Sequence, residues 1–119
     1  MISESLKKAS LEILILAMLN NDDMYPYQIV QNLIAKSDSK YTIIAGVAYP
    51  VLYRMQDKGY ITCREEKTGK RRTVHIYHLE EAGREYLREQ CGDFFEVADL
   101  IKAILNEKGG RENWFKAKM

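Results

Sequence analysis

A proline inside a helical pattern constrains the fold of this chain more than any other feature of its sequence. It lies in the segment GVAYPVLYRMQDKGYI, residues 46–61. Proline lacks a backbone N–H and its ring clashes with the preceding turn, so a helix tolerates it best at its beginning. We therefore predict a helix that starts at Gly46 or Val47, with Pro50 at the last position where the missing donor does no harm. Gly59 predicts the end of this helix.

The same helix divides into two faces at helical spacing. Ala48, Leu52 and Met55 are spaced by four and three residues, which predicts the face turned to the core. The opposite face, called the tyrosine face below, consists of Gly46, Tyr49, Pro50 and Tyr53. Tyrosine hydroxyls can bind phosphates, and tyrosine rings can pack on sugars or on thymine methyl groups. We therefore interpret the tyrosine face as a binding surface, with Tyr49 as a partly packed structural residue as the alternative.

The remaining elements follow from periodicity and turn signals. Residues 3–20 read as a helix that is apolar nearly all round in its second half, and residues 26–37 read as a second helix that begins at a proline. Two strand-like runs, residues 60–66 and 73–79, are separated by KTGKRR, which predicts a β-hairpin with a strongly basic tip. The helical pattern returns over residues 81–108.

Charge is distributed unevenly along the chain, although the formal net charge is only +1. Residues 40–79 hold eight Lys or Arg against three acids, a net charge of +5, whereas residues 80–107 hold three against eight, a net charge of −5. This asymmetry indicates a polyanionic partner for the middle of the chain alone.

The last helix carries an apolar seam spaced by four, three, four, three and four residues, which is typical of a helix that pairs with another helix. The seam consists of Leu87, Cys91, Phe94, Ala98, Ile101 and Leu105. A helix of this length spans about 40 Å, too long to bury its seam on a domain of about 80 residues. We therefore expect a homodimer. Gly83 and Gly92 each weaken the helix by about 1 kcal/mol relative to alanine, so packing must hold it.

Three helices followed by a basic hairpin are the element order of a winged helix-turn-helix, in which the third helix enters the major groove of DNA and the hairpin, or wing, touches the backbone. The fold class expected is thus mainly α with a small β-hairpin, a winged helix-turn-helix plus a C-terminal dimerisation helix. The residues expected to contact DNA are Thr42, Gly46, Tyr49, Pro50, Tyr53, Arg54, Lys67, Lys70, Arg71 and Arg72. Two alternatives stay open: Arg54 braces the wing or Asp57, and the wing cations only form a solvated turn.

Five stretches of the sequence resemble the PadR family of bacterial transcriptional regulators. GVAYPVLYRM followed by GYI is similar to the family's G-x-L-Y-P-x-L-x-R-L and G-L-I in the third helix. LEILIL at residues 11–16 and YQI at residues 27–29 resemble its first and second helices. GKRR and IYHLEEAG resemble its wing and the exit from the wing. The single C-terminal helix resembles the shorter subgroup.

The resemblance implies a homodimer that binds a palindromic operator, usually as a repressor. It also implies dimerisation through the C-terminal helix and, in some members, a small aromatic effector near the dimer interface. Phe94 and Phe95 are therefore either dimer core or part of such an effector pocket. We expect a DNA-binding domain over residues 1–79, a dimerisation helix over 80–108 and a tail over 109–119, where Trp114 is either exposed or a ligand contact. The two lone cysteines and the lack of a signal peptide predict a cytoplasmic protein.

Several other classes of function lack their sequence signals. No cofactor motif or catalytic constellation is present, which argues against an enzyme for phenolic compounds. His75 and His78 fall on opposite faces of a strand, so we expect no shared metal. Cys63 and Cys91 lack partner spacing and are interpreted as free, buried thiols, with redox sensing as the weaker alternative. The apolar run near the start is too short to span a membrane. The main rival is a winged-helix module that binds a protein and no DNA.

Overall fold

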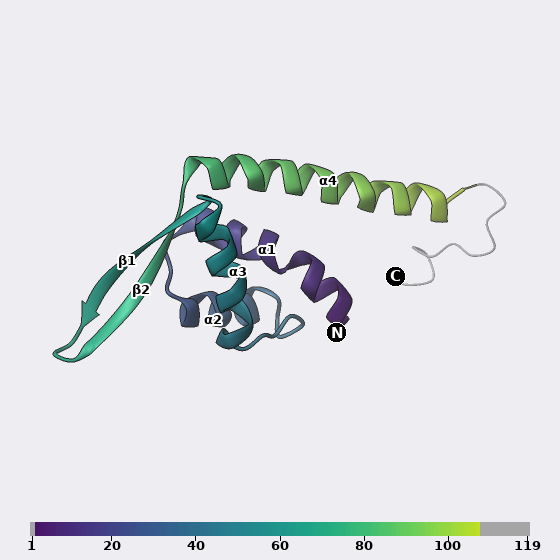
Figure 1. Ribbon diagram of the computed structural model, residues 1–119. Coiled ribbons are helices and arrows are strands. Elements are labelled where there is room, and N and C mark those ends of the chain that lie inside the picture. Colours follow the sequence, from purple (N-terminus) through teal and green to yellow (C-terminus); the bar gives the residue numbers. More distant parts are fainter. Residues whose placement is uncertain (1, 108–119) are drawn as a thin grey trace. The chain divides into compact units, whose positions relative to one another are not determined.

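The computed structural model describes residues 2–107, which form four helices and one antiparallel hairpin (Figure 1). The elements in chain order are α1 (Glu4–Asn21), α2 (Pro26–Lys36), α3 (Ala45–Asp57), β1 (Ile61–Thr68), β2 (Arg72–Leu79) and α4 (Glu81–Leu105). This order confirms the predicted fold class, which is mainly α with a winged helix-turn-helix. The predicted tail and Trp114 lie outside the described residues. Among the described helices, none is long and apolar enough to cross a membrane.

The chain forms two compact units, and the boundary between them lies inside α4. One unit extends to Leu87 and the other begins at Arg88. The predicted domain limits at residues 79 and 108 stay predictions.

The first two helices supply much of the core of the first unit. The Ser3 hydroxyl oxygen caps α1 by accepting a hydrogen bond from the Leu6 N–H at 3.3 Å. Ile15 and Leu16 of α1 and Ile29 of α2 are fully buried. The side chain of Gln28 reaches back to accept the Tyr25 N–H at 3.0 Å, which satisfies a free donor at the start of α2.

The start of α3 differs from the prediction. The helix begins at Ala45 after the extended residue Ile44, whose carbonyl accepts the Val47 N–H at 3.0 Å. Pro50 therefore lies inside the helix and not in its first turn, and the expectation that its missing donor does no harm was wrong. The acceptor that loses its partner is the Gly46 carbonyl, one turn earlier. Because Gly46 and Pro50 are both exposed, solvent can reach this part of the helix.

The two predicted faces of α3 are confirmed. Ala48, Leu52 and Met55 have no exposed surface, and they pack into the core. The side opposite is open, with Tyr49 38% and Tyr53 54% exposed.

The hairpin is longer than predicted and is joined to the linker between α1 and α2. Strand pairing runs from Ile61 opposite Leu79 to Thr68 opposite Arg72, so the turn is only three residues long and contains Gly69 at a φ of 78°. Glycine adopts this left-handed conformation without strain. Met24 forms a bridge to Tyr77, with N–H to carbonyl distances of 3.2 and 2.8 Å in the two directions. The bridge fixes the base of the wing to the helical core.

The beginning of α4 packs closely on Tyr60, which lies between α3 and β1. The Glu80 N–H donates to the Tyr60 carbonyl at 3.0 Å, and the Tyr60 and Tyr86 rings stack with centroids 4.3 Å apart. A Cβ atom on Gly83 would overlap the same Tyr60 carbonyl oxygen. Glycine at position 83 is therefore explained by close approach of two backbones, whereas a Cβ on Gly92 would meet nothing within 4 Å.

Candidate nucleic-acid interface

The tyrosine face is the exposed side of α3. Tyr49 and Tyr53 lie one turn apart, with ring centroids 5.9 Å apart, and Gly46 and Pro50 on the same face are exposed as well. The face presents two phenol hydroxyls and two aromatic surfaces beside a stretch of backbone without large side chains. Such a surface can approach a sugar-phosphate backbone or a base edge closely.

The four wing cations lie at and around the tip of the hairpin. Lys67 is near the end of β1, Lys70 and Arg71 are in the turn, and Arg72 begins β2. All four side chains are exposed, and within residues 2–107 none of them forms an ion pair. They are therefore available to a polyanion.

A groove of about 500 Å³ runs between the start of α2, the tyrosine face and the wing. Tyr27 and Tyr49 line it on the helical side, and Arg72, Thr73 and His75 line it on β2. Tyr27 is 61% exposed. Tyr27 was not among the predicted site residues, although its position beside the proline that begins α2 was a usable signal.

Arg54 lies on the side of α3 that faces α1. Its Nη2 atom is 3.2 Å from Oε2 of Glu12 on α1, and its side chain is half exposed. The other carboxylate oxygen of Glu12 accepts a hydrogen bond from the Tyr86 hydroxyl of α4 at 2.5 Å. This bond raises the pKa of Tyr86 to about 12, so the phenol stays protonated at neutral pH. The partner of Arg54 is therefore Glu12, which the sequence analysis missed, and not Asp57.

Thr42, the remaining predicted DNA contact, is exposed ahead of α3. It lines a cavity of about 470 Å³ between α1 and α3, together with Lys7, Lys8 and Arg54. Three cations thus share the wall of this cavity with Thr42.

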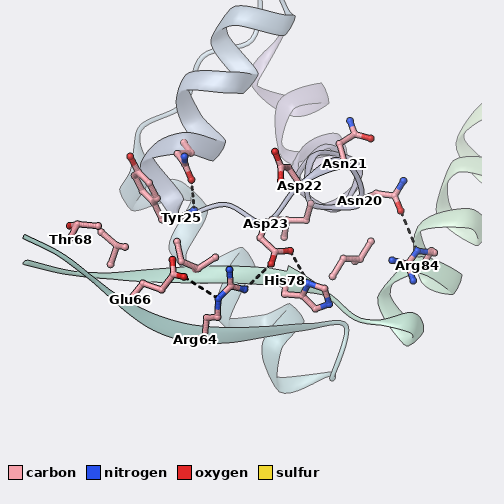
Figure 2. A pocket seen from close by; sticks show the side chains of 15 residues that line it. Asn20, Asn21, Asp22, Asp23, Tyr25, Arg64, Glu66, Thr68, His78 and Arg84 are labelled. Carbon is pink, nitrogen blue, oxygen red and sulfur yellow. Dashed lines mark hydrogen bonds and ion pairs between the residues drawn. The ribbon is translucent and has the colours of Figure 1, made fainter.

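The base of the wing carries a charged network around Asp23, which follows α1 (Figure 2). The Asp23 carboxylate lies 2.7 Å from Nη1 of Arg64 on β1 and 2.7 Å from Nδ1 of His78 on β2. Hydrogen bonds from Arg64 first and from His78 second hold the pKa of Asp23 below its usual value. These groups line a cavity of about 610 Å³. The network joins both strands of the wing to the loop before α2.

The histidines and cysteines form no metal cluster among the described residues. His78 binds Asp23, whereas His75 lies with its Nδ1 atom 3.6 Å from Sγ of Cys63. Cys63 and Cys91 are both free, as predicted, but they are partly exposed and not buried. The expectation of buried thiols was wrong because Cys63 lies beyond the helical core on the wing strand β1.

The predicted seam on α4 contains both covered and open positions. Leu87, the last residue of the first unit, is buried, whereas Phe94 is 45% and Ile101 is 52% exposed. Cys91, Ala98 and Leu105 are half-buried. Beside the seam, α4 also exposes Phe95, Val97, Leu100 and Ile104, each by more than half of its surface. The Phe94 and Phe95 rings meet edge to face, with centroids 6.3 Å apart.

Comparison with known proteins gives a consistent family assignment. Residues 15–89 match the model of the transcriptional regulator PadR-like family. The chain is 32% identical over 93 residues to the transcriptional regulator YqjI of Escherichia coli, and this match covers 78% of the chain but only 43% of that longer protein.

Solved structures agree with this assignment. A transcriptional regulator from Clostridium thermocellum superposes with a TM-score of 0.77 at 25% identity, over 85% of this chain and 95% of that one. The Bacillus subtilis PadR structure, in complex with operator DNA, superposes with a TM-score of 0.64 at 23% identity, over 68% of this chain and 46% of that one. At that identity the second likeness speaks for the fold alone.

Proposed function

The chain belongs to the PadR-like family of transcriptional regulators, and we propose that it binds double-stranded operator DNA as a homodimer and represses transcription. The observation that carries this proposal is the exposed tyrosine face of α3 together with four exposed wing cations. Because the members of this family are transcriptional regulators, the alternative of an enzyme for phenolic compounds is excluded.

In this proposal the tyrosine face enters the major groove. Tyr49 and Tyr53 contact phosphates and base edges, and exposed Gly46 and Pro50 allow the helix backbone to approach. Thr42 and Arg54 lie at the α1 side of the helix, where they extend the contact to the next phosphates.

The wing cations supply affinity that does not depend on sequence. Lys67, Lys70, Arg71 and Arg72 neutralise backbone phosphates, and each neutralised phosphate releases a counterion. Four cations in each of two protomers give eight such contacts, for which affinity falls by on the order of a thousandfold or more between 50 and 200 mM salt. The groove between α2 and the wing, lined by Tyr27, is a suitable path for the backbone.

Dimerisation through α4 would cover its exposed apolar residues. Phe94 and Ile101 of the seam are joined by Val97, Leu100 and Ile104, which widen the apolar stripe to one side. Burial of apolar surface is stabilising by about 25 cal/mol per Å², so a second helix of the same kind is a favourable cover. Two-fold symmetry of the dimer would match a palindromic operator.

The proposal includes a small aromatic effector that releases the DNA. The basis for this effector is the edge-to-face pair of Phe94 and Phe95, which offers an aromatic wall to a small aromatic molecule. In the simpler version, both rings belong to the dimer core and no effector binds there. Isothermal titration of the dimer with simple phenolic acids separates these versions, since only the first expects heat of binding that is lost in Phe95→Ala.

The experiment that tests DNA binding is a fluorescence anisotropy titration with a labelled duplex from the region upstream of the chain's own gene. We expect nanomolar affinity at 50 mM salt, steep weakening at 200 mM, and weaker binding to an unrelated duplex of equal length. Binding that is absent or insensitive to salt would instead favour the rival function, a winged-helix module that recognises a protein.

A further inference from the structure

One carboxylate connects the DNA-facing helix α3 to the start of α4. Glu12 of α1 binds Arg54 of α3 through Oε2 and Tyr86 of α4 through Oε1. The Glu12 side chain is only 20% exposed, whereas that of Arg54 is 50% exposed. All three residues belong to the same compact unit.

The two partners of Glu12 bind different oxygens of its carboxylate. An arginine and a carboxylate pair most strongly when both oxygens receive an N–H in parallel. Tyr86 occupies Oε1, so Arg54 is held at 3.2 Å by the other oxygen alone. Within residues 2–107 the remaining guanidinium donors of Arg54 have no acceptor, so they can meet a phosphate. A doubly held Arg54 would have fewer free donors, and its charge would be more fully neutralised.

Tyr86 is itself held firmly in place. Its ring stacks on Tyr60 with an interplanar angle of 12°, and Gly83, one turn earlier in α4, packs against the backbone of Tyr60. The hydroxyl therefore reaches Glu12 only while the first turns of α4 keep their packing on Tyr60. A displacement of this helix start would remove the donor from Oε1.

We propose that Glu12 restrains Arg54 from DNA and that Tyr86 weakens this restraint, so that the position of the α4 start sets DNA affinity. With Tyr86 in place, Glu12 holds Arg54 through one oxygen only, and the other donors of Arg54 can reach a phosphate. Once Tyr86 withdraws, Glu12 takes Arg54 with both oxygens and the affinity falls. The inference rests on the proposed function, because it assigns a regulatory role to residues beside the proposed DNA-binding surface.

The test uses the full chain and two labelled duplexes, one from upstream of its own gene and one unrelated duplex of equal length. Glu12→Gln should bind both about threefold to fivefold more tightly, because it releases an arginine from an ion pair of ordinary surface strength. It should also make the dependence of affinity on salt steeper by about one counterion. Tyr86→Phe should bind about threefold more weakly.

Combined variants show whether these effects pass through the same atoms. Tyr86→Phe should have no effect when Glu12→Gln is already present, and Glu12→Gln should have none in an Arg54→Gln background. Glu85→Gln removes the same charge from an exposed site on α4 and is the matched control, with affinity expected to stay at the wild-type value. Circular dichroism melts of each variant check that it is folded.

The outcomes separate this inference from the proposed function. If the wild type binds but Glu12→Gln binds no more tightly, or if its gain survives Arg54→Gln, the restraint does not exist. If Tyr86→Phe weakens binding equally with and without Glu12→Gln, Tyr86 acts through packing and the inference is refuted. A wild type that binds neither duplex refutes the proposed function, and the inference with it.

Discussion

Replacing Gly83 by alanine tests whether the start of α4 depends on close backbone contact. The added Cβ would overlap the Tyr60 carbonyl oxygen and would lie 2.7 Å from Cδ1 of Leu79. The leucine side chain can move, but the carbonyl belongs to a backbone that also accepts the Glu80 N–H at 3.0 Å. Relief of the overlap must therefore shift α4 or the residues after α3.

The size of the effect follows from two opposing contributions. Alanine is favoured over glycine in a helix interior by about 1 kcal/mol. Overpacking typically costs about 1–3 kcal/mol, and loss of the Glu80 hydrogen bond adds about 1 kcal/mol. We therefore expect Gly83→Ala to lower the free energy of unfolding by about 1–3 kcal/mol.

Gly92 on the same helix is the matched control. A Cβ there would meet nothing within 4 Å, so Gly92→Ala should raise the free energy of unfolding by up to about 1 kcal/mol. Urea unfolding followed by circular dichroism measures both variants, at one protein concentration because a dimer's stability depends on concentration. If Gly83→Ala is as stable as Gly92→Ala, the close approach does not constrain the helix and the packing argument for Tyr86 fails too.

Three further predictions concern the wing, the dimer and acid sensitivity. In anisotropy titrations, the double variant Arg71→Gln with Arg72→Gln should bind all duplexes more weakly by a similar factor, and its salt dependence should fall by about two counterions per protomer. A changed sequence preference would contradict the assigned role of the wing. Ile101→Asp should convert a dimer to monomer, because it places a charge in the α4 seam, and light scattering that returns an unchanged mass would refute that interface. The Asp23 carboxylate stabilises the fold above its ordinary pKa of 3.8, and this stabilisation is lost as the pH falls through its lowered pKa in the folded state. The wild type should therefore have a higher melting temperature than Asp23→Asn at pH 7, and the two melting temperatures should converge in strong acid. A difference in melting temperature that is constant at all pH values would exclude ionisation of Asp23 as the cause.

Periodicity predicted those parts of the fold that depend on neighbours in sequence. The burial of Leu52 and Met55 and the exposure of Tyr53 follow from helical spacing, and both are found. The hairpin followed from alternation around a glycine turn. The start of α3 could not be predicted in this way. Ile44, the residue before the helix, is extended and has no side chain that can cap it, so no sequence pattern marks the position.

Contacts between residues far apart in the sequence could not be predicted from the sequence pattern. Glu12 and Arg54 are 42 residues apart, and Glu12 and Tyr86 are 74 apart, so no local pattern joins them. The same holds for the bridge from Met24 to Tyr77 and for the approach of Gly83 to Tyr60. Spacing predicts which side of an element is apolar, but it does not predict which carboxylate a given arginine meets.

The uninterrupted course of α4 from Glu81 to Leu105 has a consequence for how relatives of this chain can vary in length. Tyr86 and the apolar seam after it belong to the same helix, so an insertion of a single residue between them would change the helical phase of every later side chain by about 100°. Insertions of seven residues restore nearly the same phase. Natural or engineered changes of length after Leu87 should therefore be tolerated when they are of about seven or eleven residues and rejected at most other lengths.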